Sequence, residues 1–294
     1  MKIFVTGVGS FIGKAFVRWC DDAGHQISGV DLASVGRDDC HVADIRTANL
    51  AELIPDNVDA IVHLAALSRD PDCRGKAYDC FQTNVMSTIK LMDAGQTKGA
   101  KQFIFASSEW VYTDYPNSGP ATEETPINIT KHKSEYALSK LVSEANLRQY
   151  ALQGAENVTI LRFGIVYGPR EKNWCAVEGL LNQVVNKSEI SVGSAQTARC
   201  FIHVDDVAAG IGASIGAPGF QIYNIQGARP VDLGEVVNTS ARLLNREVNL
   251  LESAPDTPSI RWVSGEKAKR DLHWEPQISF ADGLQSVIDF LGLK

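Results

Sequence analysis

The residues Lys2-Ile-Phe-Val-Thr-Gly-Val-Gly-Ser-Phe-Ile-Gly13 decide the fold of this chain. The apolar run Lys2–Thr6 predicts a buried strand, and Phe11–Ala23 has the spacing of an amphipathic helix. Three glycines lie at the turn between them, where backbone amides and a helix N-terminus can meet a pyrophosphate. The stretch therefore predicts the first strand–loop–helix unit of a dinucleotide-binding domain.

The rest of the first two-thirds alternates short apolar runs with amphipathic stretches, which is typical of βαβ units. Further strands are expected at Gln26–Asp31, Ala60–Leu64, Gln102–Ala106 and Val158–Arg162. Further helices are expected at Thr47–Leu53, Cys80–Lys98 and Lys131–Gln153. Crossovers of this kind join parallel strands, so the predicted fold class is α/β, a Rossmann-type doubly wound parallel sheet.

After Pro169 the alternation loosens, which indicates a smaller C-terminal substrate-binding lobe. Its expected helices are Val177–Asn186, Asp205–Ile215, Asp232–Leu244, Gly265–Asp271 and Phe280–Phe290. Its expected strands are Ile190–Val192, Gln221–Ile225 and Val248–Leu251. The predicted division is 1–168 for a nucleotide-binding domain that carries the catalytic residues and 169–294 for the lobe, with some segments returning to the first domain.

The composition limits the classes of function. With 28 Lys and Arg against 35 Asp and Glu, the net charge is −7, which argues against a nucleic-acid or membrane partner. The first apolar run breaks at Gly7, far short of the ~20 residues of a membrane span. The six cysteines show no metal-like spacing, so we expect no metal and favour reduced thiols in a cytoplasmic enzyme.

Asp31 ends the second predicted strand. A carboxylate at this position accepts hydrogen bonds from a ribose diol and repels a 2′-phosphate, which favours NAD over NADP as the cofactor. Arg37, which lies nearby in the sequence, leaves NADP open.

Tyr136-Ala-Leu-Ser-Lys140 is the second informative segment. On a helix, residues i and i+4 share a face, so the phenol and the ammonium group can point at one site. A nearby cation lowers the pKa of a phenol from its ordinary value of about 10, which gives a group able to exchange a proton with an alcohol. Together with the glycine loop, the pair predicts hydride chemistry.

Several segments occur in the order typical of one known family. Besides the two above they are Asp44-Ile-Arg46, Val62-His-Leu-Ala-Ala66, Asn84-Val-Met-Ser-Thr88, Leu161-Arg-Phe-Gly-Ile-Val-Tyr-Gly-Pro169 and Arg199-Cys-Phe-Ile-His-Val-Asp-Asp-Val-Ala208. Over nearly its whole length the chain resembles the extended short-chain dehydrogenases/reductases of the NAD-dependent epimerase/dehydratase family, which mostly act on nucleotide sugars. It departs from the family's T-G-x-x-G-x-x-G loop by placing Ser10 where the middle glycine is expected.

The resemblance implies which residues bind the dinucleotide. Asp44 and Ile45 are expected at the adenine, and the end of the third predicted strand is expected at the ribose and phosphates. The full expected set is Gly7, Gly9, Ser10, Phe11, Ile12, Gly13, Asp31, Asp44, Ile45, Leu64, Ala65, Ala66, Tyr136 and Lys140. His63 is interpreted as structural, and Asn84 as a residue that holds neighbouring loops together.

The resemblance also implies that Ser108, Tyr136 and Lys140 are catalytic. Ser108 would hydrogen-bond the substrate oxygen that Tyr136 protonates or deprotonates, and Lys140 would also bind the nicotinamide ribose. Ser107 is expected to contribute indirectly, through contacts behind the site.

Glu109 and Trp110 are expected, with Ser108, to contact the substrate. In dehydratase and decarboxylase relatives, an acidic residue beside the Val-Tyr pair acts on sugar carbons beyond the oxidised centre. Trp110 cannot transfer a carbon-bound proton, whereas Glu109 lies where dehydratases often have an aspartate. Elimination chemistry is therefore weakened but not excluded.

Arg199 and Arg261 are the expected ligands of a substrate diphosphate, because guanidinium binds phosphate bidentately. His203 and the pair Asp205-Asp206 are expected to order a loop and cap the next helix. Ile165 replaces an asparagine that commonly touches the substrate in the family, so contacts to the sugar are expected to differ.

The leading hypothesis is an NAD-dependent nucleotide-sugar epimerase that acts at C4 through a transient keto sugar. The alternatives are an NAD(P)-dependent reductase or dehydrogenase of a nucleotide sugar or free sugar derivative, a 4,6-dehydratase, and a non-catalytic dinucleotide-binding protein. The resemblance also implies a homodimer formed through the helices predicted at Cys80–Lys98 and Lys131–Gln153.

Overall fold

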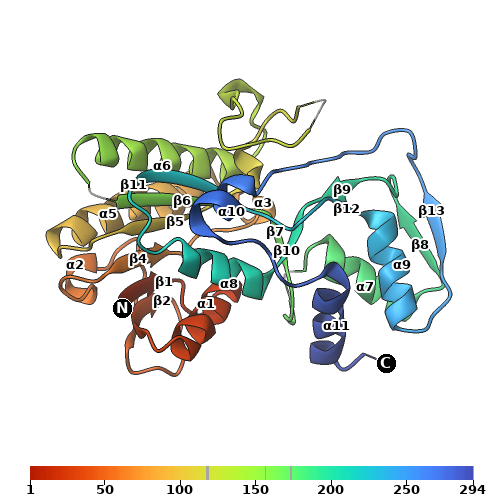
Figure 1. Ribbon diagram of the computed structural model, residues 1–294, viewed down its shortest axis with the longest axis horizontal. Helices are drawn as coiled ribbons and strands as arrows, with labels where there is room; N and C mark the ends of the chain where they lie inside the picture. Colours follow the sequence, from red (N-terminus) through yellow and green to blue (C-terminus); the bar gives the residue numbers. More distant parts are fainter. Residues whose placement is uncertain (117–118, 156, 173, 294) are drawn as a thin grey trace.

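Seven parallel strands form the central sheet of the computed structural model, which describes residues 1–116, 119–155, 157–172 and 174–293 (Figure 1). Their spatial order is β11-β6-β5-β4-β1-β2-β3. The strands are β1 (Lys2–Thr6), β2 (Gln26–Asp31), β3 (Cys40–Val42), β4 (Ala60–His63), β5 (Phe103–Ser108), β6 (Asn157–Phe163) and β11 (Gly219–Ile225). The order reverses between β1 and β4, where a doubly wound sheet opens its ligand crevice. The predicted fold class is confirmed.

Helices cover both faces of the sheet (Figure 1). Along β1, Ile3 and Val5 pack into one core layer and Phe4 into the other, as expected from the alternation of side chains along a strand. The first layer is completed by α1 (Phe11–Asp22), α8 (Val204–Ala213) and α10 (Glu266–Leu272). The second is completed by α2 (Leu50–Leu53), α5 (Ser87–Thr97) and α6 (Glu135–Leu152).

A smaller lobe lies beside the sheet, on the right in Figure 1. Its helices are α7 (Ala176–Asn186), α9 (Leu233–Leu243) and α11 (Phe280–Leu291), whose apolar faces share one core. Its strands pair as β7 (Ile165–Tyr167) with β10 (Phe201–His203), β9 (Ala198–Arg199) with β12 (Val231–Asp232), and β8 (Glu189–Val192) with β13 (Asn249–Glu252). The division of the chain at residue 168 stays a prediction, while β11, α8 and α10 lie on the large sheet.

The chain returns from the lobe to the sheet along residues 253–264, which run across the upper right of the view in Figure 1 between β13 and α10. This returning segment pairs with both parts of the protein. The amide of Arg261 donates to the carbonyl of Ala198 (3.0 Å), and the amide of Ala121 donates to the carbonyl of Trp262 (2.8 Å). The segment thus carries Arg261 to the boundary between lobe and sheet.

Two predicted helices begin later than expected. In one case a side chain caps the helix at a later residue, and in the other a turn precedes the helix. Helix α6 begins at Glu135, after Ser134, whose hydroxyl accepts a hydrogen bond from the amide of Ala137. Helix α2 begins only at Leu50, since the preceding turn is held by Asp44, which accepts from the amide of Arg46.

The helix predicted at Cys80–Lys98 is interrupted. It consists of α4 (Ala77–Phe81), a π-helical turn at Gln82–Met86 and α5, and a short helix α3 (Asp70–Cys73) precedes it. Single π-helical turns are rare and occur often at functional sites. Here the turn carries Asn84, whose side chain donates to Ser139 in α6.

Two further properties concern the described part of the chain. No helix there combines the length and the apolar composition needed to cross a membrane. Nor do three His, Cys, Asp or Glu side chains gather there in a group that could hold a metal ion.

The contact between α1 and α8 gives a test of the packing. A Cβ atom at Gly212 would lie 2.2 Å from the ring of Trp19, whereas one at Gly179 in α7 would meet no atom within 4 Å. We expect Gly212→Ala to lower the free energy of unfolding by roughly 1–3 kcal/mol through overpacking. Gly179→Ala, the matched control, should raise it by up to about 1 kcal/mol through helix propensity. Urea denaturation measures both, and equal stability of the two variants would contradict the packing.

Candidate active site

In the glycine loop, backbone segments pass so close to each other that a side chain would not fit between them. Gly7 has φ 77°, and a Cβ atom there would lie 2.8 Å from the amide nitrogen of Ala65. A Cβ atom at Gly13 would lie 2.1 Å from the carbonyl oxygen of Gly7. Ser10, the departure from the family loop, is the N-cap of α1 and accepts from the amide of Gly13 (3.0 Å). The substitution therefore supplies a helix cap at the expected phosphate-binding position.

Asp31 lies at this loop, at the carboxyl end of β2. Its Oδ2 accepts from the amide of Gly9 (2.8 Å), so the carboxylate is held beside the expected cofactor ribose. Arg37 is held elsewhere, since its guanidinium pairs with Asp21 (2.7 Å) and Asp39 (2.8 Å). The acid is thus placed at the loop while the nearby cation is already neutralised.

The end of β4 is fixed by a buried histidine. His63 is hydrogen-bonded through Nδ1 to Thr6 (2.6 Å) and through Nε2 to Thr88 (3.0 Å). Burial, helped by the charge of Lys140, lowers the pKa of His63 to about 3, so the ring is neutral. The structural role predicted for His63 fits these contacts, and its partner Thr6 also accepts from the amide of Ala65 (3.2 Å) in the adjacent loop.

Asp44 and Ile45 differ in their surroundings. The Asp44 carboxylate forms an ion pair with Arg46 (2.6 Å), whose hydrogen bond lowers the pKa of that acid. Ile45 is buried in the core between the sheet and α5. The adenine contact expected of both residues stays a prediction.

Asn84 links three segments at the site, as the sequence indicated. Its side chain donates to the carbonyl of Leu67 (3.0 Å) and to the hydroxyl of Ser139 (2.9 Å), and it accepts from the amide of Leu67 (2.8 Å). The π-helical turn, the loop after β4 and helix α6 are therefore tied together.

Ser108, Tyr136 and Lys140 are brought together at the carboxyl ends of the strands. Ser108 ends β5, and the other two residues lie in the first two turns of α6. All three side chains are buried. The Lys140 Nζ donates to the carbonyl of Ala106 (2.7 Å) and lies 4.8 Å from the centre of the Phe105 ring.

The expected effect of Lys140 on the Tyr136 pKa is not what the structure shows. Burial raises the pKa of Tyr136 to about 12, and the nearby Ser108 hydroxyl offsets only part of that rise. The ammonium lies 6.0 Å from the phenol ring centre, and burial lowers its own pKa to about 8. Burial therefore sets the direction of the Tyr136 pKa, which i, i+4 spacing alone could not reveal.

A buried ion pair behind the site was missed by the sequence analysis. Arg162 donates to Glu144 through Nη2 (2.7 Å) and Nε (3.0 Å), and Ser107 donates to the same carboxylate (2.5 Å). Arg162 also donates to the hydroxyl of Tyr112 (3.0 Å). The signal was present, because Glu144 is four residues after Lys140 on the same helix. The indirect role expected of Ser107 fits this contact.

A second missed feature is the apolar wall beside the phenol. Cys73 and Cys80 are fully buried and cluster with Tyr136, with Leu67 and Trp110 packed against them. Their chain positions gave no indication, because the loop after β4 and the irregular α3–α4 region place them there.

Glu109 is the most unusual side chain of the site. It is fully buried, and neither of its carboxylate oxygens has a hydrogen-bond partner in the described part of the chain. Burial raises the pKa of Glu109 to about 7, and the charges of Arg261 and Arg199 limit that rise. A protonatable carboxyl therefore lies directly after Ser108.

The two predicted phosphate arginines come together from distant parts of the chain. The Arg199 guanidinium donates to the carbonyl of Ser259 (2.5 Å) in the returning segment. Arg261 lies over the ring of Trp110 (5.2 Å) and the ring of Tyr115 (5.8 Å). Burial and the neighbouring Arg261 charge lower the pKa of Arg199. Two adjacent cations thus lie at the boundary of sheet and lobe.

The residues after Arg199 also do what the sequence indicated. His203 caps α8 by accepting from the amide of Asp205 (3.3 Å). Asp206 accepts from the amides of Gln277 (2.9 Å) and Ile278 (3.1 Å), which orders the chain before α11.

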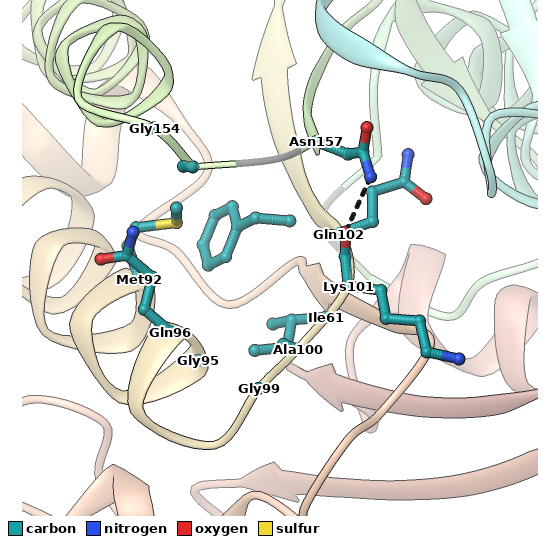
Figure 2. A pocket seen from close by; sticks show the side chains of 12 residues that line it. Ile61, Met92, Gly95, Gln96, Gly99, Ala100, Lys101, Gln102, Gly154 and Asn157 are labelled. Carbon is teal, nitrogen blue, oxygen red and sulfur yellow. Dashed lines mark hydrogen bonds between the residues drawn. The ribbon is translucent and has the colours of Figure 1, made fainter.

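A hollow of about 280 Å³ lies elsewhere, as Figure 2 shows. It is lined by Met92, Gln96, Gln102 and Gly154 among others, at the amino ends of β5 and β6. Open parallel sheets bind ligands at the carboxyl ends of their strands, so this hollow is not the site described above.

A glycine loop followed by an N-capped helix lies where the strand order reverses, and a Ser–Tyr–Lys group lies at the strand ends. Together these features define a short-chain dehydrogenase/reductase. A family model described as the NAD dependent epimerase/dehydratase family matches residues 3–225, and the chain belongs to that family. The predicted family, and with it an enzyme of the isomerase or oxidoreductase class, is confirmed.

Individual relatives are more distant. A Bacillus subtilis protein described as an uncharacterized UDP-glucose epimerase is 29% identical over 99% of this chain and 98% of its own. The Thermotoga maritima UDP-glucose 4-epimerase with UDP-glucose has a TM-score of 0.86 at 22% identity, covering 99% of both chains. MoeE5 in complex with UDP-glucuronic acid and NAD has a TM-score of 0.87 at 24% identity, with the same coverage. The two structures support the fold.

The buried Glu109 makes a prediction about stability and pH. The acid is protonated in the folded protein up to about pH 7 but ionises in the unfolded chain near 4.5, so stability falls as the pH rises between these values. Glu109→Gln should remove this loss and gain about 3 kcal/mol relative to wild type between pH 4 and pH 8. Urea denaturation across pH measures the difference.

The control for Glu109 is Glu124→Gln, which removes an exposed carboxyl. A stability difference between Glu109→Gln and wild type that stays constant with pH would show that Glu109 is not a buried, protonated acid.

Proposed function

We propose that this protein is an NAD-dependent nucleotide-sugar epimerase that acts at C4 of the sugar. The observation that carries the proposal is the buried group of Ser108, Tyr136 and Lys140 at the strand ends. Trp110 lies beside the phenol, at the position where elimination would need an acidic residue. A Ser–Tyr–Lys group with a tryptophan at position 110, in place of a base for a carbon-bound proton, suits oxidation and reduction of a single carbinol.

The cofactor residues fit a dinucleotide. Side chains are excluded at Gly7 and Gly13 by backbone contacts, and Ser10 begins the helix whose N-terminus faces the loop. This is the arrangement that accepts a pyrophosphate. When bound there, NAD supplies the acceptor and donor of the hydride.

The chain's own residues handle the proton. Tyr136 would take the proton of the sugar hydroxyl as that carbon is oxidised and return it when the carbon is reduced on its other face. Ser108 would hold the same oxygen by a hydrogen bond, and the Lys140 ammonium would favour the ionised phenol and bind the nicotinamide ribose. Because burial raises the pKa of Tyr136, the phenol needs these partners to act near neutral pH.

The substrate side is supported by charge. Arg199 and Arg261 form a dicationic surface beside the catalytic group, which suits a diphosphate. The named relatives act on or bind UDP-sugars, which supports a nucleotide sugar as the substrate.

One observation favours a second candidate, a 4,6-dehydratase. Glu109, with a pKa of about 7, could protonate a leaving hydroxyl. Elimination also needs a base for the neighbouring carbon, and position 110 holds a tryptophan. Analysis of the products by NMR separates the two, since elimination yields a deoxy keto sugar and epimerisation yields a 4-epimer of the same mass.

Two expectations stay proposals. The homodimer would form through α5 and α6, and light scattering of the purified protein tests it. The cytoplasmic location is proposed from the preferred interpretation of the cysteines as reduced thiols.

The cofactor preference gives one prediction. Asp31 at the loop and the neutralised Arg37 should make NAD bind at least roughly tenfold more tightly than NADP, measured by calorimetry. Asp31→Asn should reduce that ratio, because it removes the charge that repels a 2′-phosphate. Asp22→Asn, an exposed acid at the far end of α1, is the control. Equal affinities in the wild type would contradict the assignment.

Tyr136→Phe tests the proposed mechanism. Removing the hydroxyl should lower kcat by about 10²- to 10⁴-fold, because proton transfer is lost, while NAD and nucleotide-sugar affinities change little. Conversion of UDP-glucose to UDP-galactose by wild type and variant provides the measurement. Full activity of Tyr136→Phe would exclude the tyrosine as acid–base group. If wild type converts keto sugars only with added NADH or NADPH, it is instead a reductase.

A further inference from the structure

Trp110 lies between the catalytic tyrosine and a phosphate-binding arginine. The centres of the Trp110 and Tyr136 rings are 6.5 Å apart, and the rings meet edge to face at 70°. The guanidinium carbon of Arg261 lies 5.2 Å from the Trp110 ring centre. One indole therefore touches both groups, whose chain positions are 125 residues apart.

The backbone of Trp110 is attached to the third member of the site. Glu109–Val111 is a 3₁₀ turn that begins after Ser108, and the Ser108 hydroxyl accepts from the Trp110 amide (3.2 Å). The position of Trp110 thus depends on Ser108, and any shift of its ring displaces the wall against which Tyr136 packs.

Arg261 is itself held from both sides. Its guanidinium also lies over Tyr115, and its backbone amide is bonded to Ala198, next to Arg199. A phosphate that engages Arg261 would fix the guanidinium over the indole, where a cation–π contact is worth about 0.5–2 kcal/mol. In this way, part of the binding energy of the diphosphate can be used to orient the groups at the reacting centre.

We propose that Trp110 is a positioning residue that transmits diphosphate binding at Arg261 to the orientation of Tyr136. This inference rests on the proposed function for its substrate, a nucleoside diphosphate sugar. It adds a role for a residue that carries no reactive group. A ring at position 110 is required, and an aliphatic side chain of similar volume is not equivalent.

The kinetic test compares Trp110→Leu and Trp110→Phe with Trp262→Leu, a matched change at an exposed tryptophan beside Arg261. Trp110→Leu should lower kcat roughly 10- to 100-fold with little change in KM, since a small misplacement of a catalytic group costs this much. Trp110→Phe should recover part of kcat.

The pH profile distinguishes positioning from a loss of folding. Because burial raises the pKa of Tyr136, opening its wall in Trp110→Leu should move the limb of the kcat profile that reports the phenol to lower pH. Among the described residues, the polar and titratable groups that face Tyr136 are Ser108, Lys140, Cys73 and Cys80, and all are retained in the variant. An unshifted limb, or a kcat loss no larger than that of Trp262→Leu, would overturn the proposal.

A binding experiment separates this inference from the proposed function. UDP titrated into the wild-type protein should change the intrinsic tryptophan fluorescence, and Trp110→Phe should lose most of that change while Trp262→Phe keeps it. The measurement needs no turnover. Failure of every nucleotide sugar to react would refute the epimerase, whereas a UDP response that survives in Trp110→Phe would refute the role of Trp110.

Discussion

The ion pair between Glu144 and Arg162 is the interaction on which the site depends. Both side chains are almost completely buried, at 5% and 4% exposure, so each charge has only the other and its hydrogen-bond partners for compensation. Removing one partner of such a pair typically costs 3–5 kcal/mol, because the remaining charge is left uncompensated. Its geometry fixes β5, β6 and α6 relative to one another, and those elements carry Ser108, Tyr136 and Lys140.

The same network extends toward the substrate side. Arg162 donates to Tyr112, whose hydroxyl donates to Asn224 (2.8 Å) in β11, and Asn224 donates to the carbonyl of Ser264 (3.1 Å). Ser264 ends the returning segment that carries Arg261. A continuous chain of buried and part-buried polar contacts thus connects α6 with the returning segment that carries Arg261, and such networks rigidify what they join.

The sequence predicted those parts of the site that depend on local spacing. The glycine loop, Asp31 and the pair Tyr136–Lys140 could be placed because strand and helix periodicities fix which residues share an edge or a face. The family resemblance added Ser108 and the two arginines. The π-helical turn, the cysteine wall and the raised pKa of Tyr136 could not be predicted, because each arises from packing between segments distant in the chain. The orphaned carboxyl of Glu109 belongs to the same group: its position was expected, but its burial was not.

The placement of α10 has a consequence for how the protein can be made. Ala268 and Trp274 pack into the core that includes α1 and β1, and Trp274 lies against Gly210 in α8. The first layer of the sheet is therefore completed by residues near the far end of the chain. During synthesis the N-terminal half leaves the ribosome well before these residues do. Its apolar face therefore stays exposed until they have been made. A chain cut after Lys140 would lack Ala268 and Trp274, so the first layer of the large sheet can be completed only by residues that follow the lobe in the sequence.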